Sequence, residues 1–284
     1  MGSDYCWISI SFGTLMPLAI PEHTGQPEDV LLGRKVLGAL SRTEPAESVQ
    51  CDCVVELAPG KLYELTGESN SGKSVVVQDV LISCLLRGHA AVIVDCDYRL
   101  DVLGLLEKIR ELCNAELLLT VVDISRARNL STSFSKSMLR RLTIQKCANL
   151  TELQLFVGFR LPQLLLSEPV SVVAIDSLTS FYWHERYATP NVLDAYSTLW
   201  QRIASLAKQF GVTAISTMQN LFRQQASPFT NDRPFLRPAG LDVTAALVKN
   251  LGQGKFALEF ADRTDVYQMN VGQLARVSTC VKAK

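Results

Sequence analysis

Histidine is scarce in this chain, and its cysteines are scattered. There are three histidines among 284 residues and no Cys-x-x-Cys pattern. A zinc site needs clustered thiolates or imidazoles, and imidazole catalysis needs a histidine beside its partners, so neither chemistry is expected. Several cysteines fall inside apolar runs, as Cys84, Cys96 and Cys113 do, and we expect these to be reduced core residues.

The sequence also lacks an excess of charge and a long apolar run. Lys plus Arg and Asp plus Glu number 28 each, so nucleic-acid binding must come from local patches rather than a global positive field. No stretch reaches the about 18 uninterrupted apolar residues of a membrane span. The apolar residues 5–20 are interrupted by Ser9, Ser11 and Thr14, and no Lys or Arg precedes Arg34, which disfavours a secretory signal. We expect a soluble, intracellular protein without membrane contact.

A complete phosphate-binding loop, Gly-x-x-x-x-Gly-Lys-Ser, occupies residues 67–74. An alternating segment at 61–66 precedes it and an apolar run at 75–86 follows it, which places the loop between a strand and a helix. Its glycines permit the backbone to wrap around a polyphosphate at the positive end of that helix. The side chain of Lys73 is expected to bind the β- and γ-phosphates of ATP, and Ser74 to ligate Mg²⁺. The predicted ATP-binding residues of the loop are Gly67, Glu68, Ser69, Asn70, Ser71, Gly72, Lys73 and Ser74.

Strand-like and helical segments alternate from residue 61 onward, as in a parallel sheet covered by helices. The predicted strands are 61–66, 91–96, 142–147, 170–175 and 212–217, and the predicted helices are 72–87, 100–112, 151–166 and 194–210. Two further candidate strands, 255–260 and 266–271, flank a polar turn. We therefore expect an α/β fold with a mostly parallel central sheet, helices on both faces and a C-terminal antiparallel extension. Residues 1–55 are expected to form an arm and a short helix, without a separate DNA-binding domain, and residues 56–284 to form the core.

Residues 114–140 interrupt this alternation. The part 117–124 is compatible with a strand or with a buried helical segment. Residues 125–146 then carry six basic side chains and no acidic one, which is typical of a solvated face or a mobile loop and also compatible with a nucleic-acid or partner surface. The basic residues are Arg126, Arg128, Lys136, Arg140, Arg141 and Lys146.

A second nucleotide-binding signal lies at residues 172–176, where small and branched apolar residues end in a carboxylate. A buried central strand has this composition when it delivers an Asp to the Mg²⁺ side of a phosphate-binding loop. Because the loop lies roughly 100 residues upstream, Asp176 is the candidate ATP-binding and Mg²⁺-binding carboxylate.

The residues around Asp176 resemble the Asp-Ser strand end of RecA/RadA-type recombinases, and Phe181, Tyr182 and Trp183 are similar to the residues that follow it in their eukaryotic paralogues. Residues 94–98 and 100–103 are similar to the strand and helix after the phosphate-binding loop in the same paralogues. The similarity runs from about residue 29 to about residue 220, is poor at 114–140 and fades beyond Gln219. It implies a RecA-like P-loop ATPase core that acts in the nucleus, in homologous-recombination repair of DNA double-strand breaks.

By this resemblance, Gln219 is the γ-phosphate sensor that couples ATP to two DNA-binding loops, residues 184–191 and 221–239. The second loop combines arginines with phenylalanines, which suits phosphate contact and base stacking. Its candidate nucleic-acid contacts are Arg223, Arg233 and Arg237. Asp97 stands where recombinases carry their catalytic glutamate, and its carboxylate lies about 1.5 Å further back from the attacking water. We therefore expect weak or absent ATP turnover.

The resemblance implies an adaptor rather than a filament-former. Only about 66 residues precede the phosphate-binding loop, fewer than the helical DNA-binding domain of full recombinases needs. The tail after Gln253 has no clear match to the basic strand that caps ATP from a neighbouring recombinase. The implied partners are other recombinase paralogues in a hetero-oligomer, the D-type paralogue first among them, together with single-stranded or branched DNA.

Two other functions remain open. A small-molecule P-loop kinase would use the basic 126–146 segment as its lid. A pseudo-ATPase scaffold would keep the loop as a structural relic and act by partner binding alone. The Asp176-Ser177 pair and the strand end at Gln219 favour the recombinase-like interpretation. Phosphate assays separate the kinase from the other two functions, and nucleotide-linked thermal shifts separate the scaffold.

Overall fold

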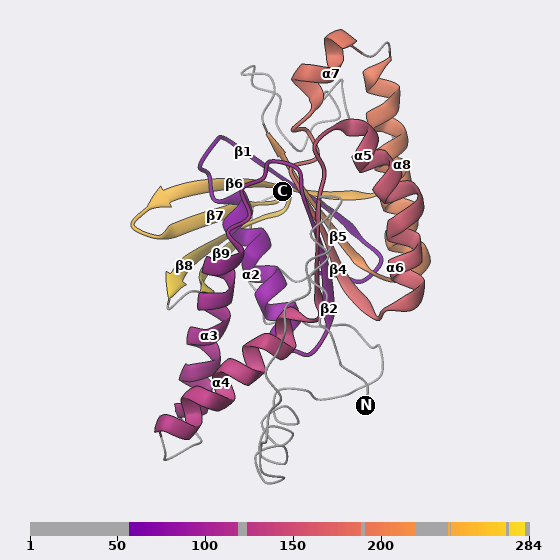
Figure 1. Cartoon of the computed structure of the whole chain (residues 1–284). Helices are drawn as coiled ribbons and strands as arrows, with labels where there is room; N and C mark the ends of the chain where they lie inside the picture. Colours follow the sequence, from indigo (N-terminus) through magenta and orange to yellow (C-terminus); the bar gives the residue numbers. More distant parts are fainter. Residues whose placement is uncertain are drawn as a thin grey trace, which may run out of the picture.

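The computed structural model of the chain describes residues 57–118, 124–188, 191–219, 238, 240–270 and 273–281. Within these ranges, nine strands form one sheet in the order β3-β2-β4-β5-β1-β6-β7-β8-β9 (Figure 1). The strands are β1 (Leu62–Gly67), β2 (Ala90–Asp95), β3 (Leu142–Lys146), β4 (Val170–Asp176), β5 (Thr213–Gln219), β6 (Val243–Gly252), β7 (Lys255–Glu259), β8 (Arg263–Asn270) and β9 (Gln273–Val281).

The strands from β3 to β6 in spatial order pair in parallel, and β7, β8 and β9 extend the sheet by antiparallel pairing. The α/β class, the mostly parallel sheet and the antiparallel C-terminal strands are therefore confirmed. Each parallel strand needs a crossover connection, and helices supply most of these connections. As a result, the carboxyl ends of the parallel strands all lie at one edge of the sheet.

Helices cover both faces of the sheet, as expected (Figure 1). The helices α2 (Lys73–Leu86), α3 (Val102–Leu118) and α4 (Ile124–Leu139) pack on one face. The other face carries α5 (Leu150–Leu155), the π-helical turn η1 (Phe156–Arg160), α6 (Leu161–Ser167) and α8 (Val192–Phe210). The connections from β1 through β2 to β3 run over the face that carries α2, α3 and α4. The connections from β3 through β4 to β5 return over the face that carries α5, α6 and α8. Right-handed crossovers require this change of face when the direction reverses.

Burial on both faces explains the continuous apolar runs of β2 and of residues 172–175 in β4. In β2, Val92 and Val94 belong to the core under α5, α6 and α8, whereas Ala91 and Ile93 belong to the core under α2, α3 and α4. A strand with period two therefore needs apolar residues at every position when each face has its own core. The tail strands β6 to β9 join the core on the α2 face.

The basic segment at residues 125–146 is mostly helix and strand. It forms α4 and then β3, so the prediction of a mobile loop is wrong for the described part of this segment. Residues 117–118 end α3 and residue 124 begins α4, while 119–123 lie outside the described residues. The charge pattern misled the prediction because α4 packs against α3, and among its described side chains Ser133 and Lys136 are exposed.

The C-terminal extension is larger than predicted. The expected strands 255–260 and 266–271 correspond to β7 and β8, but β6 and β9 were missed. Among the described side chains of β9, only Leu274 is buried and residues 276–281 are exposed, so no alternation of buried and exposed residues marks this edge strand. The predicted arm and helix at residues 1–55 lie outside the described residues.

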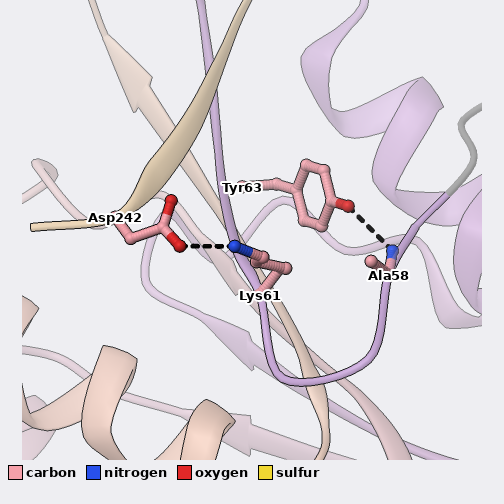
Figure 2. A network of polar contacts seen from close by, with 4 residues as sticks. All are labelled: Ala58, Lys61, Tyr63 and Asp242. Atoms are coloured by element: carbon pink, nitrogen blue, oxygen red, sulfur yellow. Dashed lines mark hydrogen bonds and ion pairs between the residues drawn. The ribbon is translucent and has the colours of Figure 1, made fainter.

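Polar contacts fix the amino-terminal end of β1, at the edge opposite the phosphate-binding loop (Figure 2). The Lys61 ammonium forms an ion pair with Asp242, which precedes β6. On the other side of the strand, the Tyr63 hydroxyl accepts a hydrogen bond of 2.8 Å from the Ala58 amide. Leu62 is in register with Val243, so these contacts lie where β1 and β6 begin to pair.

Cys84, Cys96 and Cys113 are core thiols, as expected. The cysteines at 84, 96, 113 and 147 are buried and outside any disulfide, whereas Cys280 is exposed on β9. Across the same described ranges, none of the helices has the length and apolar character needed to cross a bilayer.

Candidate nucleotide-binding site

The loop of residues 67–74 connects β1 directly to α2, as its sequence pattern predicts. Gly67 and Gly72 have φ angles of 156° and 100°, a range that side chains disfavour. A Cβ on Gly67 would lie 2.5 Å from the Val248 carbonyl oxygen, and one on Gly72 would lie 2.5 Å from the Phe256 ring. Both glycines are therefore required for two reasons: the backbone angles of the turn, and the close packing of β6 and β7 against it.

The side chain of Lys73 curls back into this loop. Its Nζ donates to the carbonyl oxygens of Gly67 at 3.0 Å and Glu68 at 2.7 Å, and to Ser71 Oγ at 3.4 Å. Burial lowers the pKa of Lys73, and the negative charges of Asp176 and Asp97 oppose that shift. The hydrogen-bond acceptors of this partly desolvated cation are neutral oxygens, and the nearby negative charges are those of Asp176 and Asp97. An anion beside the loop would add a further counter-charge.

Asp176 ends β4 at the same edge of the sheet. Its Oδ1 accepts a hydrogen bond from Thr217 Oγ1 of β5, and its carbonyl oxygen accepts one of 2.8 Å from the Cys96 amide. β5 lies between β4 and β1, and Gln219 at its end is in register with Gly67 at the start of the loop. The sheet therefore brings the Asp176 strand end, the Gln219 strand end and the phosphate-binding loop side by side.

Asp97 follows β2 at this edge. Its Oδ1 accepts a hydrogen bond from Ser180 Oγ, and that hydroxyl also lies 2.8 Å from the Ser177 carbonyl oxygen. The neighbouring Asp95 is buried and accepts from the amides of Arg99 and Leu100 at 3.1 and 3.2 Å. Asp95 is committed to the turn before α3, so Asp97 is the carboxylate of this pair that remains for chemistry.

The predicted site residues fall into two groups. The structure brings residues 67–74, Asp97 and Asp176 to one edge of the sheet, and it places the Gln219 backbone there as well. The Gln219 side chain and the candidate DNA contacts Arg223, Arg233 and Arg237 lie outside the described residues. Sequence reasoning missed Thr217 and Ser180, which position Asp176 and Asp97. In the sequence, Thr217 stands out only as a polar residue within a predicted strand. Ser180 stands out only as a polar residue in the turn after a strand.

Ser74 and Asp176 carry hydroxyl and carboxylate oxygens, which are ligand types that Mg²⁺ takes beside the phosphates of a nucleotide. Within the described part of the chain, no group of three or more His, Cys, Asp or Glu residues is arranged to hold a metal ion. Mg²⁺ retains waters and takes phosphate oxygens beside one or two protein ligands, so a nucleotide site does not require such a group. Ser74 is exposed at the start of α2, where its hydroxyl is accessible to a ligand.

The first predicted DNA-binding segment is helical where it is described. Helix α7 (Tyr182–Ala188) follows the end of β4, so the prediction of a loop is wrong for residues 184–188. Trp183 and Tyr187 are 43% and 81% exposed, and the Arg186 guanidinium lies 5.0 Å from the centre of each ring. We call Trp183, Arg186 and Tyr187 the α7 patch. Exposed rings beside a cation are suited to stacking on bases.

The C-terminal part of the basic segment lies at the opposite edge of the sheet. Arg140 and Arg141 follow α4 and precede β3, and the Arg141 carbonyl oxygen accepts from the Ala91 amide at the start of β2 at 2.9 Å. Lys146, at the other end of β3, lies at the edge of the sheet that carries the phosphate-binding loop, 5.3 Å from the Tyr98 ring centre. The side chains of Arg126 and Arg128 lie outside the described residues.

Comparison with known proteins adds no assignment. No protein-family model matches the chain, and no curated protein is significantly similar to it in sequence.

Proposed function

We propose that this chain is an accessory RecA-type recombinase paralogue that binds ATP and Mg²⁺ and acts with other paralogues in homologous-recombination repair. The observation that carries the proposal is the meeting of three strand ends. The glycine-bounded loop with Lys73, the Asp176 end of β4 and the Gln219 end of β5 lie together at one edge of a mostly parallel sheet. Ligands of open α/β sheets bind outside the carboxyl ends of the strands.

The residues of the site have separate tasks in this proposal. The amides of residues 67–74 and the Lys73 ammonium bind the phosphates, and Ser74 and Asp176 hold the metal ion. Bound Mg²⁺ would neutralise charge between the β- and γ-phosphates. Ser180 holds the Asp97 carboxylate, which orients the attacking water from one methylene further back than a glutamate would. Slow or absent hydrolysis follows from that distance.

Contacts with DNA are proposed for two segments. The α7 patch offers two exposed rings and an arginine on an element that begins six residues after Asp176. The 221–239 segment supplies Arg223, Arg233 and Arg237 directly after the Gln219 strand. Both segments are thus connected through the chain to a nucleotide-binding strand end. The resemblance to recombinase paralogues supports single-stranded or branched DNA and a hetero-oligomer with the D-type paralogue in the nucleus.

The position of Arg140 and Arg141 favours this proposal over a small-molecule kinase. A kinase lid must place its arginines over the transferred phosphate. These two arginines precede β3, at the edge of the sheet opposite the phosphate-binding loop, and there they suit contact with a partner protein. A pseudo-ATPase scaffold differs from the proposed function in one measurable respect, because it would not bind ATP.

Thermal unfolding of the full chain tests the proposal. A ligand that binds the folded state at 100 times its dissociation constant stabilises that state by about 2.7 kcal/mol. Mg-ATP should therefore raise the unfolding temperature by several degrees, and Mg²⁺ alone should not. No shift with ATP would favour the scaffold. Transfer of phosphate to a panel of small acceptors, without an effect of single-stranded DNA, would favour the kinase.

A further inference from the structure

Two connections with basic residues lie side by side at the edge of the sheet where the parallel strands begin, opposite the phosphate-binding loop. Residues 87–89 join α2 to β2, and Arg140 and Arg141 join α4 to β3. β2 and β3 pair in parallel, and the Ala91 amide donates to the Arg141 carbonyl oxygen at 2.9 Å, so the two connections are fixed next to each other. We call His89, Lys136, Arg140 and Arg141 the amino-edge cluster.

The Arg141 guanidinium is held against the turn that ends α2. Gly88 adopts a φ of 84°. The amides of residues 88 and 89 donate to the carbonyl oxygens of Leu85 and Cys84 at 3.0 and 3.1 Å, which closes the helix as a Schellman motif. A Cβ on Gly88 would lie 3.3 Å from Arg141 Nη1, and Arg141 is half-buried. The guanidinium therefore rests on this turn, and it loses less freedom on binding a ligand than a mobile surface arginine would.

The amino-edge cluster carries positive charge without a balancing carboxylate. Lys136 and Arg140 are exposed, one helical turn apart, because the Arg140 amide donates to the Lys136 carbonyl oxygen at 3.2 Å. Among the described residues, no carboxylate forms an ion pair with Lys136, Arg140 or Arg141. Burial and the positive charges of Arg87 and Arg141 lower the pKa of His89, so its imidazole also lies in a positive environment. The negative ends of α2 and α4 offset only about one unit of charge.

We propose that the amino-edge cluster binds an acidic segment of a partner protein. A carboxylate matches the planar guanidinium at two points, and the held Arg141 side chain supplies such a fork. The exposed Arg140 and Lys136 side chains attract further carboxylates of the same segment. This inference goes beyond the proposed function, because the cluster takes no part in nucleotide binding and gives the partner surface a stated chemistry.

Nucleic acid is the other polyanion that a basic cluster attracts, and it fits this place less well. The proposed DNA contacts are the α7 patch and the 221–239 segment, which follow β4 and β5 in the sequence, whereas the cluster precedes β2 and β3. Phosphate-driven binding also gains affinity from many contacts along the backbone, and this cluster offers the three cations Lys136, Arg140 and Arg141. A short acidic peptide needs no more than these.

Fluorescence anisotropy of the full chain with labelled hexaglutamate tests the proposal, with hexaglutamine as the uncharged probe. The parent should bind hexaglutamate and not hexaglutamine. Arg141→Gln keeps most of the side-chain stem and removes the fork, so it should weaken binding at least about tenfold, and Arg141→Lys should recover only part of the loss. The matched control is Lys208→Gln, which removes an exposed cation from the last turn of α8, before β5 begins at the same edge. This variant should bind like the parent.

Two results would overturn the proposal. The first is no binding of hexaglutamate to the parent, or equal binding to the parent and Arg141→Gln. The second is tighter binding of a labelled single-stranded oligonucleotide than of hexaglutamate, lost in Arg141→Gln, which would assign the cluster to DNA. If thermal unfolding shows that Arg141→Gln does not fold, the exposed pair Lys136→Gln with Arg140→Gln replaces it, with the same expected loss of about tenfold.

ATP titration of the same proteins keeps this inference separate from the proposed function. Arg141→Gln should bind Mg-ATP like the parent, because its side chain lies at the opposite edge of the sheet from the phosphate-binding loop. A parent that binds hexaglutamate and not ATP would remove the proposed function and leave the amino-edge cluster in place. A parent that binds ATP and not hexaglutamate would do the reverse.

Discussion

The Thr217 hydroxyl donates a hydrogen bond to the Asp176 carboxylate, and this contact joins the ends of β5 and β4 side chain to side chain. Thr217 is fully buried, two residues before Gln219 on the same strand. A hydrogen bond to a charged acceptor contributes about 1.5–3 kcal/mol. The strand that carries the proposed γ-phosphate sensor therefore also sets the position of the proposed metal ligand.

Replacing Thr217 should weaken metal-dependent nucleotide binding. Thr217→Val keeps the shape of the side chain and removes the donor, so Asp176 loses its fixed orientation. We expect Mg-ATP affinity to fall about threefold to tenfold, with a smaller change when Mg²⁺ is omitted. The matched control is Thr213→Val on the same strand, because Thr213 donates to the Ala58 carbonyl oxygen at the opposite edge. Equal losses in both variants would mean that the effect is general destabilisation of β5.

Lengthening Asp97 should accelerate ATP hydrolysis. Asp97→Glu restores the reach that recombinases have at this position, and correct placement of a general base contributes about 10²–10⁴ in rate. Steady-state phosphate release measures the change, and Asp97→Asn should be no faster than the parent. Brisk turnover in the unaltered chain would show that Asp97 already positions water well. Ser180→Ala removes the hydrogen bond that orients the Asp97 carboxylate and leaves the length of the side chain unchanged. Comparing it with Asp97→Glu therefore separates the effect of orientation from the effect of side-chain length.

Asp79 should make the stability of the fold depend on pH near 6. It lies on α2, and burial raises its pKa to about 6, while the Leu274 amide, which donates to it at 2.9 Å, and the charge of Lys108 oppose the shift. Because the folded pKa exceeds the unfolded value of about 3.9, the folded state binds the proton more tightly. The stabilisation is complete below about pH 4 and is lost as the pH rises through 6.

Urea unfolding of the parent and Asp79→Asn between pH 4 and 8 measures this effect. Asn keeps an acceptor for the Leu274 amide and does not titrate. Relative to this variant, the parent should lose on the order of 2 kcal/mol between pH 4 and 7. Parallel stability curves for the two proteins would show that Asp79 has an ordinary pKa.

DNA binding should be modest and strongly dependent on salt. Because the net charge is zero, affinity must come from local patches, and each phosphate contact adds about 0.7–0.9 to the slope of log K against log salt. Combining Arg223→Ala with Arg237→Ala should lower that slope by about 2 and leave ATP affinity unchanged. Fluorescence anisotropy with labelled single-stranded DNA, with and without co-purified partners, measures the slope. An unchanged slope would remove the 221–239 segment from the DNA-binding surface. Changes at Arg140 and Arg141 should instead affect partner assembly.

Much of the fold was predictable because its central strands carry local signals. The strand ending at Asp176 is apolar at every position from Val172 to Ile175 since helices bury both of its faces, and the loop at 67–74 has a fixed pattern imposed by backbone geometry. Helix α8 ends as its sequence predicts, because Gly211 adopts a φ of 65° as the C-cap. These features depend on neighbours in the sequence, so a single chain is enough to read them.

The features that were missed depend on contacts distant in sequence. β6 pairs with β1 across about 180 residues, and β9 is an edge strand whose exposed residues carry no periodic pattern. Likewise, the hydrogen bonds that position Asp97 and Asp176 come from Ser180 and Thr217, which are unremarkable polar residues in the sequence. Only the strand order reveals that these hydroxyls face the two carboxylates.

Calorimetric titration of ATP into the parent and into Lys73→Ala, each with Mg²⁺, tests the central claim most directly. The matched control is Lys61→Ala, which removes an exposed ammonium directly before β1. Lys61 lies at the end of β1 that is opposite the phosphate-binding loop. A charge-assisted contact in a partly buried site contributes about 1.5–3 kcal/mol. The account predicts that Lys73→Ala weakens ATP binding at least about tenfold while Lys61→Ala binds like the parent. Equal ATP affinity in Lys73→Ala and the parent would contradict it, because the phosphate-binding loop would then take no part in nucleotide binding.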